Sequence, residues 1–223
     1  MEYKRITLFA GHYGSGKTNV AVNYALALKK EFSRVAVADL DIVNPYFRTK
    51  DSEAMLEKNG IHLICSDYAN SNVDVPALPA EAYAVLDDKS LYAVIDVGGD
   101  DRGALALGRY APEIISENDY EMLFVINKYR PLTRESRSTV EVMREIERAG
   151  GIKFTGIINN SNLGDETTAQ NILDSLGYAD EISQITALPI VMTTVKDDLY
   201  KSVAGEVTGA VPIRLFVKQS WSK

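Results

Sequence analysis

The stretch GHYGSGKT, residues 11–18, follows the apolar run ITLFA and precedes the helical pattern VAVNYALALKK. It fits the spacing Gly, four residues, Gly-Lys-Thr, which forms a phosphate-binding loop (P-loop) when a strand enters it and a helix leaves it. Here both flanks have the required character. A chain with this loop is therefore expected to place a strand, the loop and a helix in direct succession.

The rest of the chain alternates apolar runs of strand length with helical patterns, which is typical of βαβ units and a parallel sheet. The expected strands are residues 6–10, 34–40, 61–66, 91–97, 121–127, 152–159 and 189–194. The expected helices are residues 17–30, 51–58, 77–88, 103–116, 133–149 and 166–176. This order predicts a doubly wound, mostly parallel sheet flanked by helices, the three-layer α/β/α P-loop fold, in one nucleotide-binding domain over residues 1–223.

Two segments carry boundary signals. The helix at 133–149 is expected to start with Thr133 as N-cap and to stop at Gly150-Gly151. The C-terminal segment VPIRLFVKQSWSK alternates apolar and polar residues after Pro212, which favours an edge strand over an amphipathic membrane helix.

Composition narrows the function classes. The net charge of −7 argues against direct DNA binding through a broad basic surface. The single cysteine, Cys65, excludes an internal disulfide and a CxxC metal site within one chain. No early segment resembles a signal peptide and no run has the length of a transmembrane segment, so a cytoplasmic location is expected.

The glycine loop predicts contact with an anionic phosphate chain, because glycines let several backbone N–H groups turn inward and the following helix adds its positive dipole end. Lys17 is expected to reach the β- and γ-phosphates and to take part in catalysis, and the Thr18 hydroxyl to ligate Mg²⁺. The expected nucleotide-binding positions of the loop are Gly11, His12, Tyr13, Gly14, Ser15, Gly16, Lys17 and Thr18.

Acidic residues follow two later strands. Asp96 ends the run LYAVID, and Gly99 stands three residues on, where its backbone N–H can face the γ-phosphate. Asp39 and Asp41 end the run in ADLD. Thr18, Asp39 and Asp96 are the expected magnesium residues, and Asp41 is the candidate to orient or deprotonate the attacking water.

This succession of motifs resembles the MinD/ParA/Mrp group of P-loop ATPases, the SIMIBI class with a deviant Walker A motif. The resemblance covers residues 3 to about 195 and is specific at the P-loop, at Asp39-Leu-Asp41 and at Asp96. It implies an ATP- and Mg²⁺-dependent switch that forms a homodimer around two nucleotides and acts on a protein partner or cargo.

The opening motif departs from that group, which has a lysine where this chain has His12 and a glycine where it has Tyr13. Histidine does not supply the long permanent cation of a lysine, so activation of the second subunit's nucleotide through this position is in doubt. His12 and Tyr13 either contact the nucleotide or a partner, or simply fill the loop. The segment 44–48, Asn-Pro-Tyr-Phe-Arg, stands where a switch loop of this class lies, and it either contacts a partner or closes the core.

The base-reading position points to ATP. Guanine recognition usually needs an aspartate after Asn-Lys, but Arg130 holds that place after Asn127-Lys128, and Leu163 holds it in NNSNLG. In this class the base is recognised by residues that follow the second of the two expected strands, 121–127 and 152–159. An amide side chain at that position is suited to adenine. Asn160 is the preferred base-reading residue over Asn159.

Three functions remain open from sequence. The leading one is a nucleotide-driven dimerising ATPase switch. The second is an ATP-dependent small-molecule ligase resembling dethiobiotin synthetase or the cobyrinate amidases, which also lack the first lysine. The third is a metabolite kinase with Asp41 as base. Such an enzyme normally has an arginine-rich lid, but Arg130, Arg134 and Arg137 in residues 128–137 begin an ordinary helical pattern.

Overall fold

The computed structural model describes residues 3–40, 52–65, 85–99 and 101–216, with the side chains of residues 101 and 102 left aside. Within these ranges the strands are β1 (Ile6–Ala10), β2 (Val35–Asp39), β3 (His62–Ile64), β4 (Tyr92–Asp96), β5 (Tyr120–Ile126), β6 (Gly156–Asn159), β7 (Ile190–Lys196) and β8 (Ala210–Ile213). The helices are α1 (Lys17–Glu31), α2 (Glu53–Lys58), α4 (Asp101–Gly108), α5 (Ala111–Glu117), α6 (Ser136–Gly150), α7 (Ala169–Asp174), α8 (Leu176–Thr186) and α9 (Tyr200–Val203), with single 3-10 turns at Pro131–Thr133 and Gly164–Glu166.

The strands of the described residues form one sheet of eight in the order β3-β2-β4-β1-β5-β6-β7-β8, and each of these pairings is parallel. The chain winds outward from β1 in both directions, so β1 lies at the point where the strand order reverses. In such sheets ligands bind beyond the carboxyl ends of the strands at this switch point. The expected doubly wound three-layer fold is confirmed.

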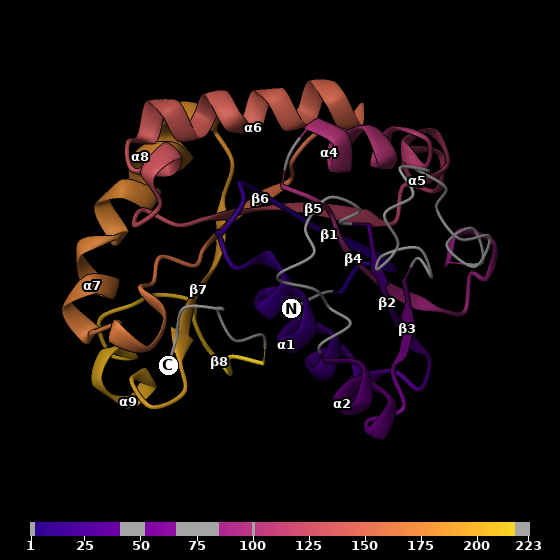
Figure 1. The fold of residues 1–223 in the computed structure, drawn as a ribbon, viewed down its shortest axis with the longest axis horizontal. Helices are drawn as coiled ribbons and strands as arrows, with labels where there is room; N and C mark the ends of the chain where they lie inside the picture. Colours follow the sequence, from indigo (N-terminus) through magenta and orange to yellow (C-terminus); the bar gives the residue numbers. More distant parts are fainter. Residues whose placement is uncertain (1–2, 41–51, 66–84, 100, 217–223) are drawn as a thin grey trace, which may run out of the picture.

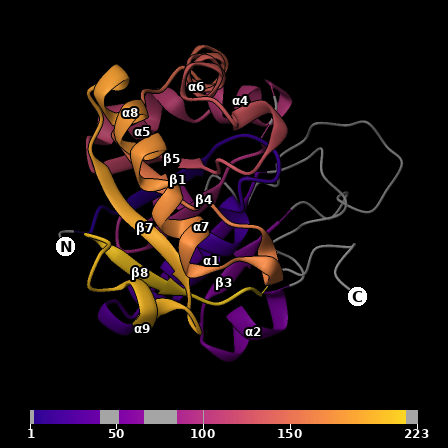
Figure 2. The ribbon, with the colours of Figure 1, turned by 90° about the vertical axis from the view of Figure 1, so that its left-hand side faces the viewer.

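Helices cover both faces of the sheet (Figure 1). Strand residues alternate between the two cores because successive side chains point to opposite faces: Ile6 and Leu8 pack with α4, α6 and α8, whereas Phe9 packs with α1 and α2. Figure 2 shows the same arrangement from the side, with α6 above the sheet and α1 and α2 below it. The sheet is therefore buried on both sides, as its continuous apolar strands predict.

Several expected boundaries were wrong. The helix at 133–149 begins at Ser136, because Thr133 closes a 3-10 turn and its hydroxyl donates to the Asn127 carbonyl at 2.8 Å. The helix at 103–116 is two helices, α4 and α5. The strand at 152–159 is paired only from Gly156.

Other expectations fall in or beside undescribed residues. The helix at 77–88 lies mostly outside the described part, which shows helix at 85–87. Cys65 follows β3 and is half-buried. Among the described residues, no helix has the length and apolar character needed to cross a membrane.

The C-terminal segment after β8 is bound to the first turns of α1. The Asn23 side chain accepts from the backbone N–H of Arg214 (3.0 Å) and donates to its carbonyl (2.8 Å). The Asn19 side chain accepts from the N–H of Phe216 at 2.8 Å. Two asparagines one helical turn apart thus replace a strand partner for this segment. An edge strand is present at this end of the sheet, but β8 spans Ala210–Ile213 and ends where the alternating pattern after Pro212 begins.

Candidate functional site

The glycine loop connects β1 directly to α1. Gly14 and Gly16 have φ of 77° and 86°, a left-handed conformation that residues with a Cβ rarely adopt. Gly16 is the N-cap of α1, and Lys17 is its first residue and is buried. The loop therefore ends in the unpaired N–H groups of a helix N-terminus, with a lysine ammonium among them.

Two further glycines let neighbouring segments approach the loop. A Cβ on Gly11 would lie 2.3 Å from the Val125 carbonyl oxygen of β5. A Cβ on Gly99 would lie 2.7 Å from the Tyr13 backbone nitrogen and 3.0 Å from the Lys17 ammonium. The segment after β4 thus packs directly against the loop after β1, as the spacing from Asp96 to Gly99 predicts.

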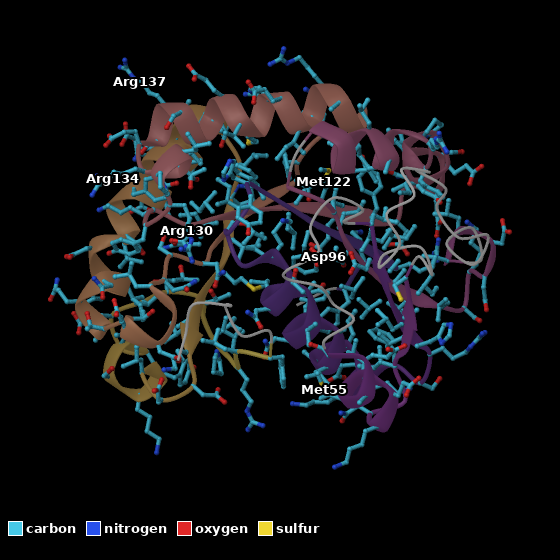
Figure 3. The ribbon with its side chains drawn as sticks, viewed as in Figure 1. Met55, Asp96, Met122, Arg130, Arg134 and Arg137 are labelled. Carbon is cyan, nitrogen blue, oxygen red and sulfur yellow. The ribbon has the colours of Figure 1, made fainter. Side chains whose placement is uncertain are left out.

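The acidic residues expected at the site meet beside the start of α1. The Thr18 hydroxyl donates to Asp96 Oδ2 at 2.6 Å. Asp39 and Asp96 are direct neighbours in the pairing of β2 with β4, and their side chains are 8% and 1% exposed. Figure 3 shows Asp96 in the interior of the molecule near α1. Parallel pairing places these residues together although they are far apart in sequence.

This group of oxygen ligands fits Mg²⁺. Two buried carboxylates side by side repel each other, and a divalent cation relieves that repulsion. Mg²⁺ is usually held by one or two carboxylates together with substrate phosphates rather than by a full protein cage. Accordingly, the described residues contain no group of three or more His, Cys, Asp or Glu side chains placed to bind a metal.

His12 turns back onto its own loop. Its Nδ1 lies 2.9 Å from the Tyr13 carbonyl oxygen, which can only accept, so Nδ1 carries the hydrogen. The remaining ring nitrogen, Nε2, can donate to a phosphate only if the ring is protonated. The Tyr13 side chain is exposed.

Asn160 follows β6 and is 2% exposed. Its amide nitrogen donates to the Ser15 carbonyl of the loop at 2.6 Å, and its amide oxygen accepts from the Thr194 hydroxyl. A Cβ on Gly16 would lie 2.3 Å from this amide nitrogen. Reading a base through this amide would require its present bonds to be exchanged, so adenine recognition by Asn160 stays a prediction. Thr194, within β7, was not anticipated.

The loop after β5 also contributes residues that sequence reasoning did not place in the site. Asn127 is fully buried, and its side-chain oxygen accepts from the backbone N–H groups of Tyr129 (3.0 Å) and Asn162 (3.2 Å). Arg130 donates from Nε to the Gly14 carbonyl at 2.7 Å. The signal for Asn127 was a polar residue directly after an apolar strand, much as Asp96 ends its strand.

Two expected parts of the site belong to residues that the structure does not describe. Asp41 and the segment 44–48 lie outside the described residues. Their roles in catalysis and partner contact stay predictions.

The parallel three-layer fold, the glycine loop at its switch point and the hydrogen bond from Thr18 to the buried Asp96 define a P-loop nucleotide-binding domain. Residues 6–172 match the family model of the CobQ/CobB/MinD/ParA nucleotide binding domain. The chain belongs to this family, as the succession of motifs in its sequence indicates. No curated protein matches the chain.

The chain is also similar in fold to solved structures of signal recognition particle proteins. FtsY from Mycoplasma mycoides has a TM-score of 0.58 at 19% identity, over 87% of this chain and 61% of that one. The cell division protein FtsY from Thermotoga maritima gives 0.58 and 19%, over 85% and 61%. The 54 kDa protein of Aeropyrum pernix, in complex with GDP, gives 0.57 and 18%, over 86% and 41%. The chain thus spans less than two thirds of the length of these neighbours, and the likeness concerns the fold alone.

Proposed function

We propose that this protein is a Mg²⁺-dependent ATP-binding protein that hydrolyses ATP and acts as a dimerising switch coupled to a partner protein or cargo. The observation that carries the proposal is the Thr18 hydroxyl bonded to buried Asp96, with Asp39 as its neighbour in the sheet. This arrangement provides oxygen ligands for a metal ion next to a helix N-terminus suited to phosphates.

The roles follow from position. The loop N–H groups and Lys17 bind the phosphates, and the N–H of Gly99 faces the γ-phosphate. Thr18, Asp39 and Asp96 hold Mg²⁺, directly or through water. Asp41 orients the attacking water, and the resident metal, when bound, neutralises the charge that develops on the phosphates.

Adenine is the proposed base. A guanine-reading carboxylate is missing from both candidate positions, since Arg130 and Leu163 occupy them, and Arg130 is turned toward Gly14. One fold neighbour binds GDP. GTP is therefore the competitor to test: a tenfold or greater preference for ATP in a displacement titration supports the proposal, and a preference for GTP contradicts it.

Exposed apolar side chains at the carboxyl edge of the sheet support dimerisation. Tyr13, Leu132 and Leu163 are 44%, 62% and 38% exposed. They follow β1, β5 and β6, which are consecutive in the sheet. Large apolar side chains on the loops around a binding site are suited to contact with a second protein surface.

The experiment is size-exclusion chromatography with light scattering, with and without ATP and Mg²⁺. The Asp41→Ala variant is used so that ATP persists. Conversion from monomer to dimer with ATP supports the switch. A monomer with ATP fully bound contradicts it.

The geometry of His12 favours one alternative. Its Nδ1 is committed to the Tyr13 carbonyl, so the position does not present the long cation that family members extend to a second subunit. An ATP-dependent small-molecule ligase of the dethiobiotin synthetase or cobyrinate amidase type needs no such cation. A metabolite that stimulates ADP release from a monomer would establish this function.

A further inference from the structure

Arg130 lies along the outer side of the glycine loop. Its Nε donates to the Gly14 carbonyl at 2.7 Å, and a Cβ on Gly14 would lie 3.4 Å from both Cδ and Nε of Arg130. The side chain therefore packs against the loop at Gly14, a position where the φ of 77° favours glycine. Figure 3 shows Arg130 directed into the molecule, whereas Arg134 and Arg137 lie at its periphery.

The loop that carries Arg130 is held in place by hydrogen bonds within the chain. The Arg130 N–H donates to the Asn127 carbonyl (3.3 Å), and the Arg130 carbonyl accepts from the Thr133 N–H (3.1 Å). The buried Asn127 side chain holds the same turn through Tyr129. A preformed turn lowers the entropy cost of using this arginine in binding.

Among the arginines whose side chains the structure describes, Arg130 is distinguished by being half-buried without an ion pair. The others without one are exposed: Arg109, Arg134, Arg137 and Arg148. The buried Arg5 is paired with Glu117, and even the exposed Arg144 is paired with Glu147. In the described part of the chain Arg130 makes no ion pair with a carboxylate, and the half-buried guanidinium has a pKa lowered by burial. Burial removes part of the water around this cation, which destabilises the charged form. An anion bound next to it would offset that loss by electrostatic attraction.

We propose that Arg130 is a nucleotide-binding residue that supplies, from within the same chain, a permanent cation to the bound phosphate chain. Nε holds the Gly14 carbonyl, and the terminal NH₂ groups, which carry the delocalised charge, remain for phosphate oxygens. The inference rests on the proposed function. It gives the site a second permanent cation in addition to Lys17, in a loop where His12 provides none.

The test is isothermal titration with a non-hydrolysable ATP analogue and Mg²⁺ on the full chain. Arg130→Gln removes the charge but keeps an N–H donor for Gly14, whereas Arg130→Lys keeps the charge. The exposed neighbours serve as controls in Arg134→Gln and Arg137→Gln. Thermal melting without nucleotide shows whether each variant folds as the wild type does.

We expect Arg130→Gln to weaken binding about tenfold or more, equivalent to ~1.4 kcal/mol. Arg130→Lys should stay within about threefold of the wild type, and both controls within about twofold, because only a charge at position 130 is involved. Binding by Arg130→Gln that equals the wild type overturns the inference, and so does equal weakening by Lys and Gln, which would leave Arg130 as a brace for the loop. If the wild type binds no nucleotide, the proposed function itself is refuted. This outcome is distinct from a failure of the inference, which is seen only when the wild type binds and the variants are compared with it.

Discussion

At the scale of single residues, the site depends on the absence of a Cβ atom at Gly99 as well as on the side chains that are present. Gly99 has no positive φ, so its need for glycine comes from space alone. A Cβ there would meet the backbone of Tyr13 and Gly11 at 2.7 and 2.9 Å, and backbone atoms cannot move aside cheaply. The loop conformation and the identity of residue 99 are therefore coupled.

Gly99→Ala should displace the glycine loop and weaken nucleotide binding by about tenfold or more, because a misplaced loop loses several N–H contacts at once, each contributing ~1 kcal/mol. Titration with a fluorescent nucleotide measures the effect. Gly177→Ala is the matched control, since a Cβ at that position would meet nothing within 4 Å. Unchanged affinity in Gly99→Ala would show that the close approach to the loop has no role in binding.

Sequence reasoning found the site residues that follow strands and missed those that act across loops. Asp39 and Asp96 were expected together because parallel strands end at one edge, and the register places them opposite each other. The contact between Arg130 and Gly14 joins residues 116 positions apart, from a side chain to a carbonyl. Neither spacing nor residue type encodes such a contact, so it could not be predicted.

At the scale of elements, one helix ends with a strained residue. Ala187 is the C-cap of α8 and has φ of 58°, the left-handed conformation in which a Cβ meets the following carbonyl. The side chain is exposed, so nothing in the packing requires alanine there. Glycine is the residue that this cap position favours.

Ala187→Gly should raise the free energy of unfolding by about 1 kcal/mol, since it removes the steric cost at the cap. The expected rise in Tm is roughly 2–4 °C for a chain of this size. Ala204→Gly is the control, because Ala204 caps α9 with a right-handed φ of −59°. It should be neutral or slightly destabilising, and a gain equal to that of Ala187→Gly would contradict the cap argument.

A second prediction concerns the amino edge of the sheet, where Glu117 at the end of α5 is paired with Arg5 and Lys89. The hydrogen bond from Arg5 lowers the pKa of Glu117 below its usual range, although burial opposes this shift. The folded state therefore binds a proton less readily than the unfolded state. The stabilisation is complete above the unfolded pKa of about 4.3 and is lost as the pH falls through the lower folded pKa.

Glu117→Gln should destabilise the protein at pH 7 by roughly 3 kcal/mol, because Arg5 is left buried without its carboxylate. Denaturant unfolding at several pH values should show the gap between variant and wild type closing below pH ~4. Nucleotide affinity should not change, since the pair lies at the opposite edge from the site. A gap that is independent of pH would exclude the ion pair as its cause.

The boundaries of the helices were predicted less well from the sequence than the presence of the strands. Thr133 had the residue type of an N-cap, but its hydroxyl bonds the Asn127 carbonyl and the helix starts later. The helix α8 was not anticipated at all, because its pattern of buried residues Tyr178, Ala179 and Ile182 is short and follows another helix directly. Strands surrounded by turns were recognised more reliably than helices that follow one another.

At the scale of the whole molecule, binding to the folded state alone stabilises it by mass action. At ATP concentrations about one hundred times Kd, with Mg²⁺ present, the gain is ~2.7 kcal/mol. A chain of this size should then melt roughly 5–10 °C higher. A thermal shift assay with EDTA should remove most of this increase, because Thr18 and Asp96 are expected to act through the metal.

Asp96→Asn should bind ATP more weakly and respond less to Mg²⁺, while Glu113→Gln, on the exposed side of α5, serves as a charge-matched control. A full thermal shift in EDTA would show that the nucleotide binds without the metal.

The overall architecture was predictable at this scale because alternation of elements and burial on both faces leave few alternatives for a parallel sheet.

The binding of the C-terminal segment to α1 has a practical consequence for handling the protein. Phe216 is bonded to Asn19, two residues beyond Lys17, whereas β1 begins at the opposite edge of the sheet. An environment-sensitive fluorophore attached at residue 216 would therefore lie beside the first turn of α1, next to the glycine loop. Such a label becomes a reporter of ligand binding at the proposed phosphate site.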